Sequence, residues 1–523
     1  MSDDSLLAPL VRHRRVLLPL GVALLFTFGY FVAPPAWNQN SRLALTRALV
    51  EDRSVVIDPH HETTGDKSWR DGHFYSDKAP GASFVATVPY AILWGVRRAT
   101  GGELPSVSVL PLDPLDVAAG RRPEPSERQP GDRLVYNLAH RLALWICGLF
   151  AVGIPSVLGA GAVFLLALHL GRGGTSDAPE PDGLRRRATL VALLYALGTT
   201  AFPYSTVLYG HQLCAAMLVI GFALVAITPA KRLAPGPALL TGLVLGLAVT
   251  AEYPAAVPAV LVALWTLRRH GMKAAVWLSL GAIVWALVLG AYHAAAFGSP
   301  LSTGYDYVYL EEFADGMRER YGIGWPDPSV LLSITFGQYR GLFYLCPVLL
   351  LAAWGLVLAV ARPACVTDSV EPAPARTPFV LAALIVVYYL LLNAGYYMWD
   401  GGASAGPRHA VPMLPFLALG LLPALRLVPV ATLVLGAVSI AQMLLITAAA
   451  PEAAQHGDPL WQYALDRVRN RQALPHATAT NLGLLLGLPG LFSLLPLVTL
   501  WAWIAPPALS LRSGPRASGS ARP

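Results

Sequence analysis

Charged residues are scarce in this 523-residue chain. They make up 13% of the sequence, against about 25% in soluble domains, while 55% of the residues are hydrophobic and the mean hydropathy is +0.52. This scarcity excludes an ordinary soluble protein and predicts a polytopic membrane protein. The 44 prolines and 47 glycines agree with that class, because neighbouring helices in a membrane satisfy the backbone groups that these residues free.

Cysteine and phosphate-binding loops are also rare or missing. The four cysteines lie within or at the ends of apolar runs, so they predict neither a disulfide framework nor a zinc site. The short basic connections contain no Gly-rich loop, which argues against a nucleotide-using site on their side of the membrane. The net charge of +7 comes mainly from arginines at the ends of hydrophobic segments, where they orient a membrane protein, so nucleic acid is not an expected partner.

Apolar runs are what the sequence has in abundance. A run of roughly 17 to 25 apolar residues crosses a bilayer. About twelve candidates occur, near 15–34, 139–170, 189–209, 211–229, 237–251, 254–267, 274–297, 342–361, 379–398, 409–425, 427–449 and 482–505. The first follows the basic stretch VRHRR and lacks a small-residue cleavage site, which favours a retained anchor and a cytoplasmic N-terminus.

One further apolar run, 82–97, decides the predicted topology. If it lies along the interface, every basic cluster between later spans falls on the cytoplasmic side, as the positive-inside rule requires. We therefore predict an all-α protein with about twelve spans and both termini inside. The predicted parts are residues 1–34 with the first span, an outer loop 35–138 with a Pro-rich excursion 101–134, a bundle 139–505 and a tail 506–523.

This topology gathers the polar residues on one face. The outward segments are 35–138, 298–340, 399–408 and 450–481, together with turns around Tyr209–His211 and Glu252–Tyr253. Any chemistry is therefore expected outside, on a substrate that is already there.

Several of these segments carry recognisable motifs. They are WNQNSRLALTRALVE (37–51), IDPHHETTGD (57–66), YSDKAPGASF (75–84), LYGHQ (208–212), AEYPAA (251–256), QYRGLFYLCP (338–347) and WDGGASAGPRHAVPMLP (399–415). With one leading helix, a large Asp-containing loop and a Lys-x-Pro-like element before an interfacial helix, the chain resembles the GT-C superfamily of integral-membrane glycosyltransferases, in particular its aminoarabinose transferases and protein O-mannosyltransferases. The motifs are similar to a mostly uncharacterised bacterial branch of that group.

The resemblance implies an activity, partners and a location. It implies transfer of a sugar from a polyprenyl-phosphate donor to a lipid, glycan or protein acceptor, at the outer face of a bacterial inner membrane. The competing interpretation is a transporter or flippase that moves a lipid-linked saccharide without bond chemistry. Transporters place polar residues near the bilayer midplane, whereas this chain concentrates them at one face, which favours the enzyme.

Such a transfer needs a carboxylate that accepts the acceptor's proton and cations that stabilise the departing phosphate. In many relatives an acidic pair follows the first helix, but this chain has Asn38-Gln39-Asn40 there. A later acid of the same loop is then the predicted base: Asp66 first, Asp58 second and Asp77 third. Each is alternatively a solvated loop charge or a helix N-cap.

Three cations are predicted to bind the donor phosphate. Lys78 is one of only 4 lysines among 38 basic residues, so a compact point charge is indicated at this position. Arg408 and Arg340 each precede an apolar span on the outer side, against the usual charge bias. The alternatives are a snorkelling lysine and interfacial anchoring by the arginines.

Five further residues are candidates for substrate binding: His73, Tyr75, His211, Glu252 and Asp400. Lone histidines more often complete local hydrogen bonds, and Glu252 is as readily a helix cap as a cavity residue. Asp400 belongs to a glycine-rich loop able to close over a substrate. No His/Asp/Glu spacing specifies a metal site, so a divalent cation between an aspartate and the donor phosphate is neither required nor excluded, and the cofactor is unknown.

Overall fold

Helices dominate the computed structural model, which describes residues 8–110, 133–173, 183–367, 376–451, 457–471 and 479–509. The polypeptide runs from a leading helix into a mixed first loop, then through a large bundle interrupted by a second loop. Most of the predicted excursion 101–134 and most of the predicted tail 506–523 lie outside the described residues.

The N-terminal part combines short helices with two β-hairpins. Its elements are α1 (Ala8–Arg12), α2 (Arg14–Gly29), α3 (Trp37–Arg47), η1 (Ala48–Asp52), η2 (Asp58–Thr63), β1 (Lys67–Arg70), β2 (His73–Ser76), α4 (Gly81–Ala99), β3 (Val107–Leu110) and β4 (Arg133–Tyr136).

The bundle begins directly after this loop. Its first half comprises α6 (Leu138–Gly148), η3 (Leu149–Gly153), α7 (Ile154–Gly171), α8 (Leu184–Gly198), α9 (Ala201–Tyr204), α10 (Gly210–Ile227), α11 (Pro235–Ala251), η4 (Tyr253–Ala255), α12 (Ala256–His270) and α13 (Met272–Phe297).

A second loop and the rest of the bundle follow. The loop holds η5 (Gly304–Tyr307), α14 (Glu311–Met317), η6 (Arg320–Gly322) and α15 (Pro328–Thr335). After it come α16 (Leu342–Leu345), α17 (Val348–Ala361), η7 (Pro363–Cys365), α18 (Thr377–Ala394), η8 (Arg408–Met413), α19 (Leu414–Ala418), α20 (Leu421–Leu427), α21 (Pro429–Ala449), η9 (Pro459–Leu465), α22 (Asp466–Arg469), α23 (Leu482–Leu485), η10 (Gly490–Leu494) and α24 (Leu495–Leu509).

The helices agree with a polytopic membrane protein. In the described chain, five are long and apolar enough to cross a bilayer, namely Leu138–Gly171, α10, α13, α18 and α21, and the bent pair Arg408–Ala418 and Leu421–Leu427 would make a sixth. Each of the twelve predicted apolar runs contains helical residues, but several of those helices are short or broken. Twelve spans therefore stays a prediction.

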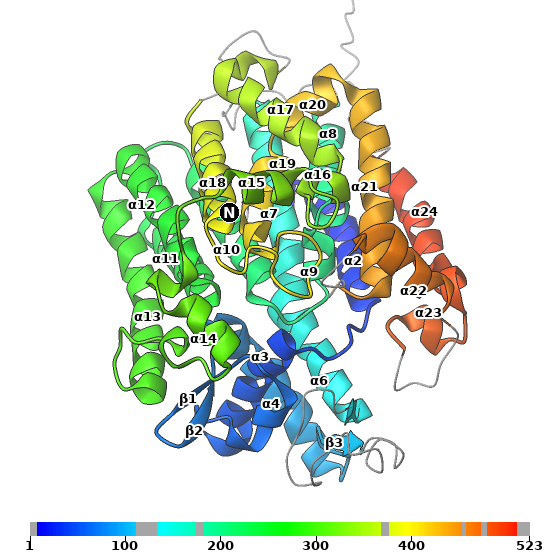
Figure 1. The fold of residues 1–523 in the computed structure, drawn as a ribbon. Coiled ribbons are helices and arrows are strands. Elements are labelled where there is room, and N and C mark those ends of the chain that lie inside the picture. The colour runs from blue at the N-terminus through cyan, green and yellow to red at the C-terminus, as the bar shows by residue number, and fades with distance from the viewer. Residues whose placement is uncertain are drawn as a thin grey trace, which may run out of the picture.

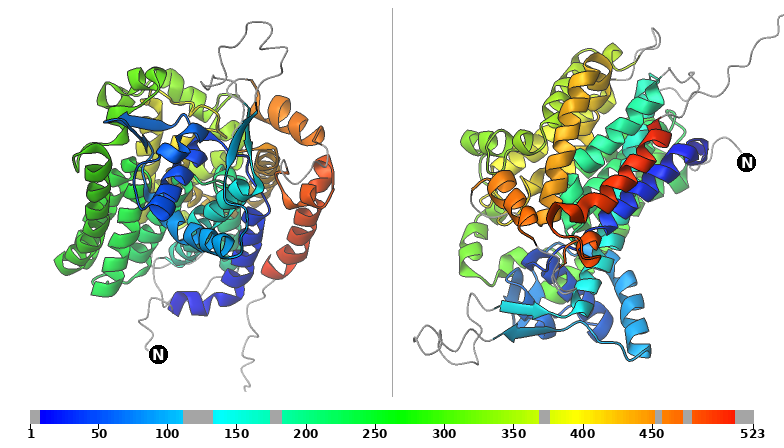
Figure 2. Two further views of the ribbon diagram at one scale, coloured as in Figure 1. Left: turned by 90° about the horizontal axis from the view of Figure 1, so that it is seen from below. Right: turned by 90° about the vertical axis from the view of Figure 1, so that its right-hand side faces the viewer.

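The expectation of an all-α chain misses two β-hairpins in the first loop. Strands β1 and β2 pair antiparallel, and so do β3 and β4. Figure 1 draws these elements together with α3 and α4 at one end of the bundle, and the view from below shows them lying across that end (Figure 2). The bundle helices thus support a separate layer of loop structure.

The apolar surface is divided between an interior and a lipid-like exterior. Helix α10 lies in the interior, with 83% of its residues buried, whereas only 17% of the residues in the apolar 18-residue stretch of α13 are buried. Exposed side chains on α13, such as Ile283, Val284 and Leu287, need an apolar environment other than water. At the opposite edge, α2 and α24 run side by side (Figure 2), and Trp501 Nε1 donates a hydrogen bond of 2.9 Å to Thr27 Oγ1.

Helix α4 occupies the run predicted as an interfacial helix. Its exposed residues Val88, Ile92 and Val96 follow each other at a spacing of four and form one apolar stripe. The opposite face buries Ala82, Ala86 and Tyr90 in the protein. This amphipathic pattern is typical of a helix that rests on a membrane surface.

Candidate active site

A cavity of about 970 Å³ lies where the first loop meets the bundle. Its walls come from residues 35–42 and 66–79 of the first loop, the turns at 209–211 and 252–254, the second loop between 303 and 323, and the stretch 388–412. All of these stretches except 388–412 belong to segments or turns predicted to face outward. Tertiary folding therefore gathers residues from five distant parts of the sequence around one space.

A tight turn sets the geometry of the first-loop wall. Asp71 and Gly72 connect β1 to β2 with φ values of 50° and 86°, the left-handed geometry of a two-residue hairpin turn, for which Asp-Gly is a preferred sequence. The turn fixes the strand register, in which Lys67 faces Ser76. This Asp-Gly signal was available in the sequence, although the sequence analysis above predicted no hairpin.

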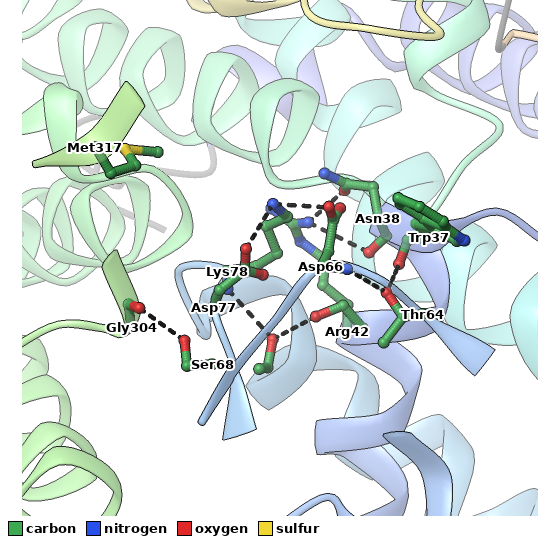
Figure 3. A network of polar contacts seen from close by, with 12 residues as sticks. Trp37, Asn38, Arg42, Thr64, Asp66, Ser68, Asp77, Lys78, Gly304 and Met317 are labelled. Atoms are coloured by element: carbon green, nitrogen blue, oxygen red, sulfur yellow. Dashed lines mark hydrogen bonds and ion pairs between the residues drawn. The ribbon is translucent and has the colours of Figure 1, made fainter. Parts of the chain in front are cut away.

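The same register carries two carboxylates to the open end of the hairpin. Asp66 and Asp77 are the next residues outward on the two strands, so the pairing brings them together. The Nζ of Lys78 lies 3.2 Å from Asp66 Oδ2 and 3.2 Å from Asp77 Oδ2. Figure 3 shows the lysine reaching both acids at the cavity wall. This arrangement places carboxylates that can accept a proton directly beside an ammonium group that can bind an anion.

The two acids differ in their environment. The Asp77 side chain is 9% exposed, and its Oδ1 is buried without a hydrogen-bond partner. Burial raises the pKa of Asp77 to about 6, although Lys78 opposes that rise. Asp66 is more open, with 16% of its side chain exposed. Asp77 is therefore the acid that exchanges its proton near neutral pH, and Asp66 is the one with easier access to a ligand.

A second ionic cluster faces the same cavity. Arg42 of α3 places Nη2 3.3 Å from Glu252 Oε1, and His211 Nδ1 lies 3.1 Å from the same oxygen. Arg42 also donates to Asn38, one turn earlier on α3. Burial raises the pKa of Glu252, with Arg42 opposing the rise. Glu252 thus holds both Arg42 and His211 in place.

Close packing at Gly81 brings the two clusters onto one cavity. A Cβ atom at this position would lie 2.5 Å from the backbone nitrogen of Ala251, so only glycine fits. The start of α4, immediately after Lys78, is thereby pressed against the end of α11, immediately before Glu252.

Arg408 contributes a cation of a different kind. It lines the cavity from the start of η8. Among the described residues it forms no ion pair, and its buried Nε has no hydrogen-bond partner. The neighbouring His409 also lines the cavity, and its ring centroid is 5.4 Å from that of His211. Arg408 therefore brings uncompensated positive charge to the site.

Arg340 lies outside the cavity lining. It is fully buried, and its Nε and Nη1 donate to the backbone oxygens of Asp400 and Ser404 at 3.0 and 2.6 Å. The carboxylate of Asp400 accepts from the Gly402 backbone and from Tyr339. Arg340 and Asp400 thus hold the glycine-containing loop whose residues Gly401 and Gly402 line the cavity.

Three other predicted residues also lie away from the cavity lining. The Asp58 carboxylate accepts from the Phe74 backbone at 2.6 Å and lies 2.7 Å from His73 Nδ1. Tyr75 is buried against Phe297, with ring centroids 5.7 Å apart. All of these contacts stabilise the hairpin and its support. Of the eleven predicted site residues, the cavity collects six: Asp66, Asp77, Lys78, His211, Glu252 and Arg408.

The asparagines that replace the expected acidic pair have separate roles. Asn38 lines the cavity and accepts from Arg42. Asn40 is buried and donates to the Thr63 backbone oxygen and to Tyr136. Arg42 was missed by the sequence analysis, and its position one helical turn after Asn38 was the available signal.

The described residues contain no group of three or more His, Cys, Asp or Glu side chains arranged to hold a metal ion. The polar groups of the cavity are instead three carboxylates, two imidazoles and three cations, together with tyrosines.

Comparisons with known proteins give structural similarities only. No family model and no curated protein matches the chain. Three solved structures are similar: ArnT from Cupriavidus metallidurans in the apo state (16% identity, TM-score 0.45), the arabinofuranosyltransferase AftD from Mycobacteria (15%, 0.38) and the archaeal oligosaccharyltransferase AglB from Archaeoglobus fulgidus, in complex with an inhibitory peptide and a dolichol-phosphate (12%, 0.39).

The alignments cover most of this chain but differ in how much of each partner they include. They take in 95%, 82% and 89% of this chain, and 76%, 28% and 58% of the ArnT, AftD and AglB chains, respectively. This chain therefore spans less than two thirds of the length of two of the three structures. With TM-scores below 0.5, the functional conclusion has to come from the residues of the cavity.

Proposed function

We propose that this protein is a membrane glycosyltransferase that moves a sugar from a polyprenyl-phosphate donor to an acceptor at the outer face of the membrane. The observation that carries the proposal is the grouping of Asp66, Asp77, Lys78 and Arg408 around one cavity at the loop-covered end of the bundle. It supplies carboxylates for a proton and cations for a phosphate, which are the two requirements of such a transfer.

The reaction conserves its atoms and electrons. The acceptor hydroxyl loses its proton to a carboxylate, and its oxygen forms a new bond to the anomeric carbon. The bond from that carbon to the phosphate oxygen breaks, and polyprenyl phosphate leaves with the electron pair. Cations next to the leaving phosphate lower the barrier by stabilising its increasing negative charge.

Asp66 is our first candidate for the base, because its carboxylate is the more exposed of the two beside Lys78. Asp77 then holds the other side of the lysine and is the second candidate. Asp58, the remaining predicted base, is used in the hairpin, where it accepts a backbone hydrogen bond. It therefore provides a matched carboxylate for control experiments.

Lys78 and Arg408 are the proposed phosphate ligands. Lys78 is already neutralised by two acids, so a donor phosphate would compete with them for its ammonium group. Arg408 brings a charge without an ion-pair partner among the described residues and can bind an anionic oxygen with its planar guanidinium. Arg42, His211 and Glu252 line the same space and are proposed to orient the sugar.

The membrane arrangement completes the proposal. Twelve spans with both termini inside would place the cavity outward, in a bacterial inner membrane, with α4 resting along the lipid surface. A polyprenyl donor would reach the cavity from the bilayer.

A transporter of lipid-linked saccharides is the alternative from another class. Secondary transporters bind their substrate near the bilayer midplane, whereas the ionic residues of this cavity come from loops and helix ends at one end of the bundle. That distribution favours the enzyme.

The test is transfer of radiolabelled sugar from a mixed pool of polyprenyl phosphosugars in membranes that contain the protein. Wild type and Asp58→Asn should transfer label, while Asp66→Asn and Lys78→Ala should lose most of the transfer. If the labelled donor instead crosses the bilayer unchanged, and equally in all variants, the protein is a transporter and not a glycosyltransferase.

A further inference from the structure

One wall of the cavity is unusually rich in tyrosine. Tyr305 and Tyr321 of the second loop and Tyr396 and Tyr397 after α18 all line it, and we call these four residues the tyrosine wall. The rings lie in pairs, with centroids 6.2 Å apart for Tyr305 and Tyr321 and 5.0 Å apart for Tyr396 and Tyr397. Nothing in the proposed proton or phosphate chemistry requires them.

The wall is held rigidly by backbone contacts between two loops. The Tyr397 backbone nitrogen donates to the Gly322 oxygen at 2.9 Å, and Gly324 donates to Gly395 at 2.7 Å. Ile323 and Tyr396 form an isolated β-bridge. The rings therefore stand on a fixed frame, as a binding surface needs.

Two hydroxyls of the wall are available to a ligand. Within the described chain, the hydroxyls of Tyr305 and Tyr397 have no hydrogen-bond partner, although both rings line the cavity. The one hydrogen bond of the Tyr396 hydroxyl to another described residue goes to the sulfur of Met317, at 3.9 Å, which is a weak acceptor. In Figure 3, Met317 stands apart from the cluster of Lys78 and the two aspartates.

This combination of flat rings and open hydroxyls has a specific chemical meaning. An aromatic face packs against the C–H face of a pyranose or furanose, while a phenolic hydroxyl pairs with a sugar hydroxyl. An isoprenoid chain would leave the hydroxyls unpaired at a cost in free energy. The wall therefore suits a saccharide better than a lipid tail.

The cavity has room for more than the sugar of the donor. A volume of about 970 Å³ is at the upper end of the range for drug-sized ligands, whereas a single sugar ring is much smaller than such a ligand. The wall lines the same cavity as the carboxylates of Asp66 and Asp77.

We infer that the tyrosine wall is an acceptor subsite for a saccharide, so that the acceptor of the proposed transfer is a glycan or the sugar headgroup of a glycolipid. The inference rests on the proposed function and narrows it. A sugar ring seated on Tyr305 and Tyr397 would bring one of its hydroxyls toward Asp66 and Asp77.

Binding of neutral hexasaccharides of glucose, mannose and galactose to the purified full-length protein in detergent tests the inference, by calorimetry and saturation-transfer NMR. At least one should bind wild type. The double variant Tyr305→Phe/Tyr397→Phe, which keeps both rings, should bind about 5- to 150-fold more weakly, because each lost hydrogen bond contributes about 0.5–1.5 kcal/mol. Tyr309→Phe, whose ring is outside the cavity lining, is the matched control.

Three results would overturn the inference. One is that none of the hexasaccharides binds, and another is that the double variant binds them as wild type does. The third is that the double variant weakens binding of the polyprenyl phosphosugar alone, which would assign the wall to the donor's sugar.

The outcome is separable from that of the proposed function. Asp66→Asn should retain hexasaccharide binding while it loses transfer. If hexasaccharides bind to the wall but no polyprenyl phosphosugar donates to any acceptor, the transferase fails, and the wall is a saccharide-binding site but not an acceptor subsite. If transfer goes to a non-saccharide acceptor at the same rate in the double variant, the subsite fails and the transferase stands.

Discussion

Arg340 and Arg408 occupy equivalent places in the sequence and very different places in the molecule. Each precedes an apolar run, and each was predicted to bind phosphate. In the structure, Arg340 is fully buried, and its guanidinium N–H groups donate to backbone oxygens of one loop, including those of Asp400 and Ser404. Arg408 lines the cavity, with a buried Nε that no described residue pairs.

The difference is one of hydrogen-bond saturation. A guanidinium has five N–H donors, and a residue that uses them on backbone oxygens has few left for a ligand. Asp58 and Asp66 repeat the contrast among the acids, since Asp58 binds the hairpin backbone while Asp66 faces the cavity beside Lys78. A charged side chain is therefore a better site candidate when its neighbours leave it incompletely paired.

Replacing the two loop acids would test this contrast with the largest expected effect. Asp66→Asn should lower the transfer rate about 10²- to 10⁴-fold, the usual contribution of a general base, as measured by radiolabel transfer. Asp58→Asn, with the same loss of charge, should retain most of the activity. Equal losses of activity in both variants would mean that lining the cavity does not distinguish the role of Asp66 from that of Asp58.

Replacing Arg408 should weaken donor binding more than replacing Arg340. Arg408→Ala removes a cation from the phosphate and should raise the KM for the donor about 10- to 150-fold, as expected for a charged hydrogen bond of about 1.5–3 kcal/mol. Steady-state transfer at varied donor concentration measures it. Arg318→Ala, whose side chain is 76% exposed, is the control, and an unchanged KM in Arg408→Ala would remove Arg408 from the site.

The pH dependence sharpens the comparison between Asp66 and Asp77. Asp77 must be ionised to hold Lys78, and burial raises its pKa to about 6. The kcat/KM should therefore be highest above pH 6 and fall about tenfold for each pH unit well below it, because the protonated form no longer pairs with the lysine. Asp77→Asn is neutral at every pH, so its kcat/KM should be low throughout and should lack this acidic limb, and a limb that persists unchanged would assign it to another group.

Arg340 should affect stability more than donor binding. Arg340→Met keeps much of the volume but leaves buried backbone oxygens of the 400–404 loop unpaired, at about 1–3 kcal/mol for each group that finds no new partner. A lower thermal unfolding temperature in detergent is expected, with a smaller change in donor KM than in Arg408→Ala. If Arg340→Met instead raised the donor KM more than Arg408→Ala did, Arg340 would be the phosphate ligand and Arg408 would have the structural role.

The sequence by itself determined the class of protein and the elements that carry the site. Its long apolar runs specify helices because a helix satisfies its own backbone hydrogen bonds in lipid, and its Asp71-Gly72 turn specifies the hairpin register. Residues 66, 77 and 78 were predictable as candidates because the transfer needs an acid of the first loop and because lysine is rare in this chain.

Only the tertiary structure decided which candidates share a cavity. The choice of Arg408 over Arg340, and of Asp66 over Asp58, depends on contacts with residues far away in the sequence, such as the loop oxygens that Arg340 binds. Arg42 and the tyrosine wall also line the cavity only because the tertiary structure packs their segments around it. Periodicity and charge bias describe one segment at a time. Hydrogen-bond pairing, burial and the access of a ligand to a charged side chain depend instead on how several segments pack around the same space.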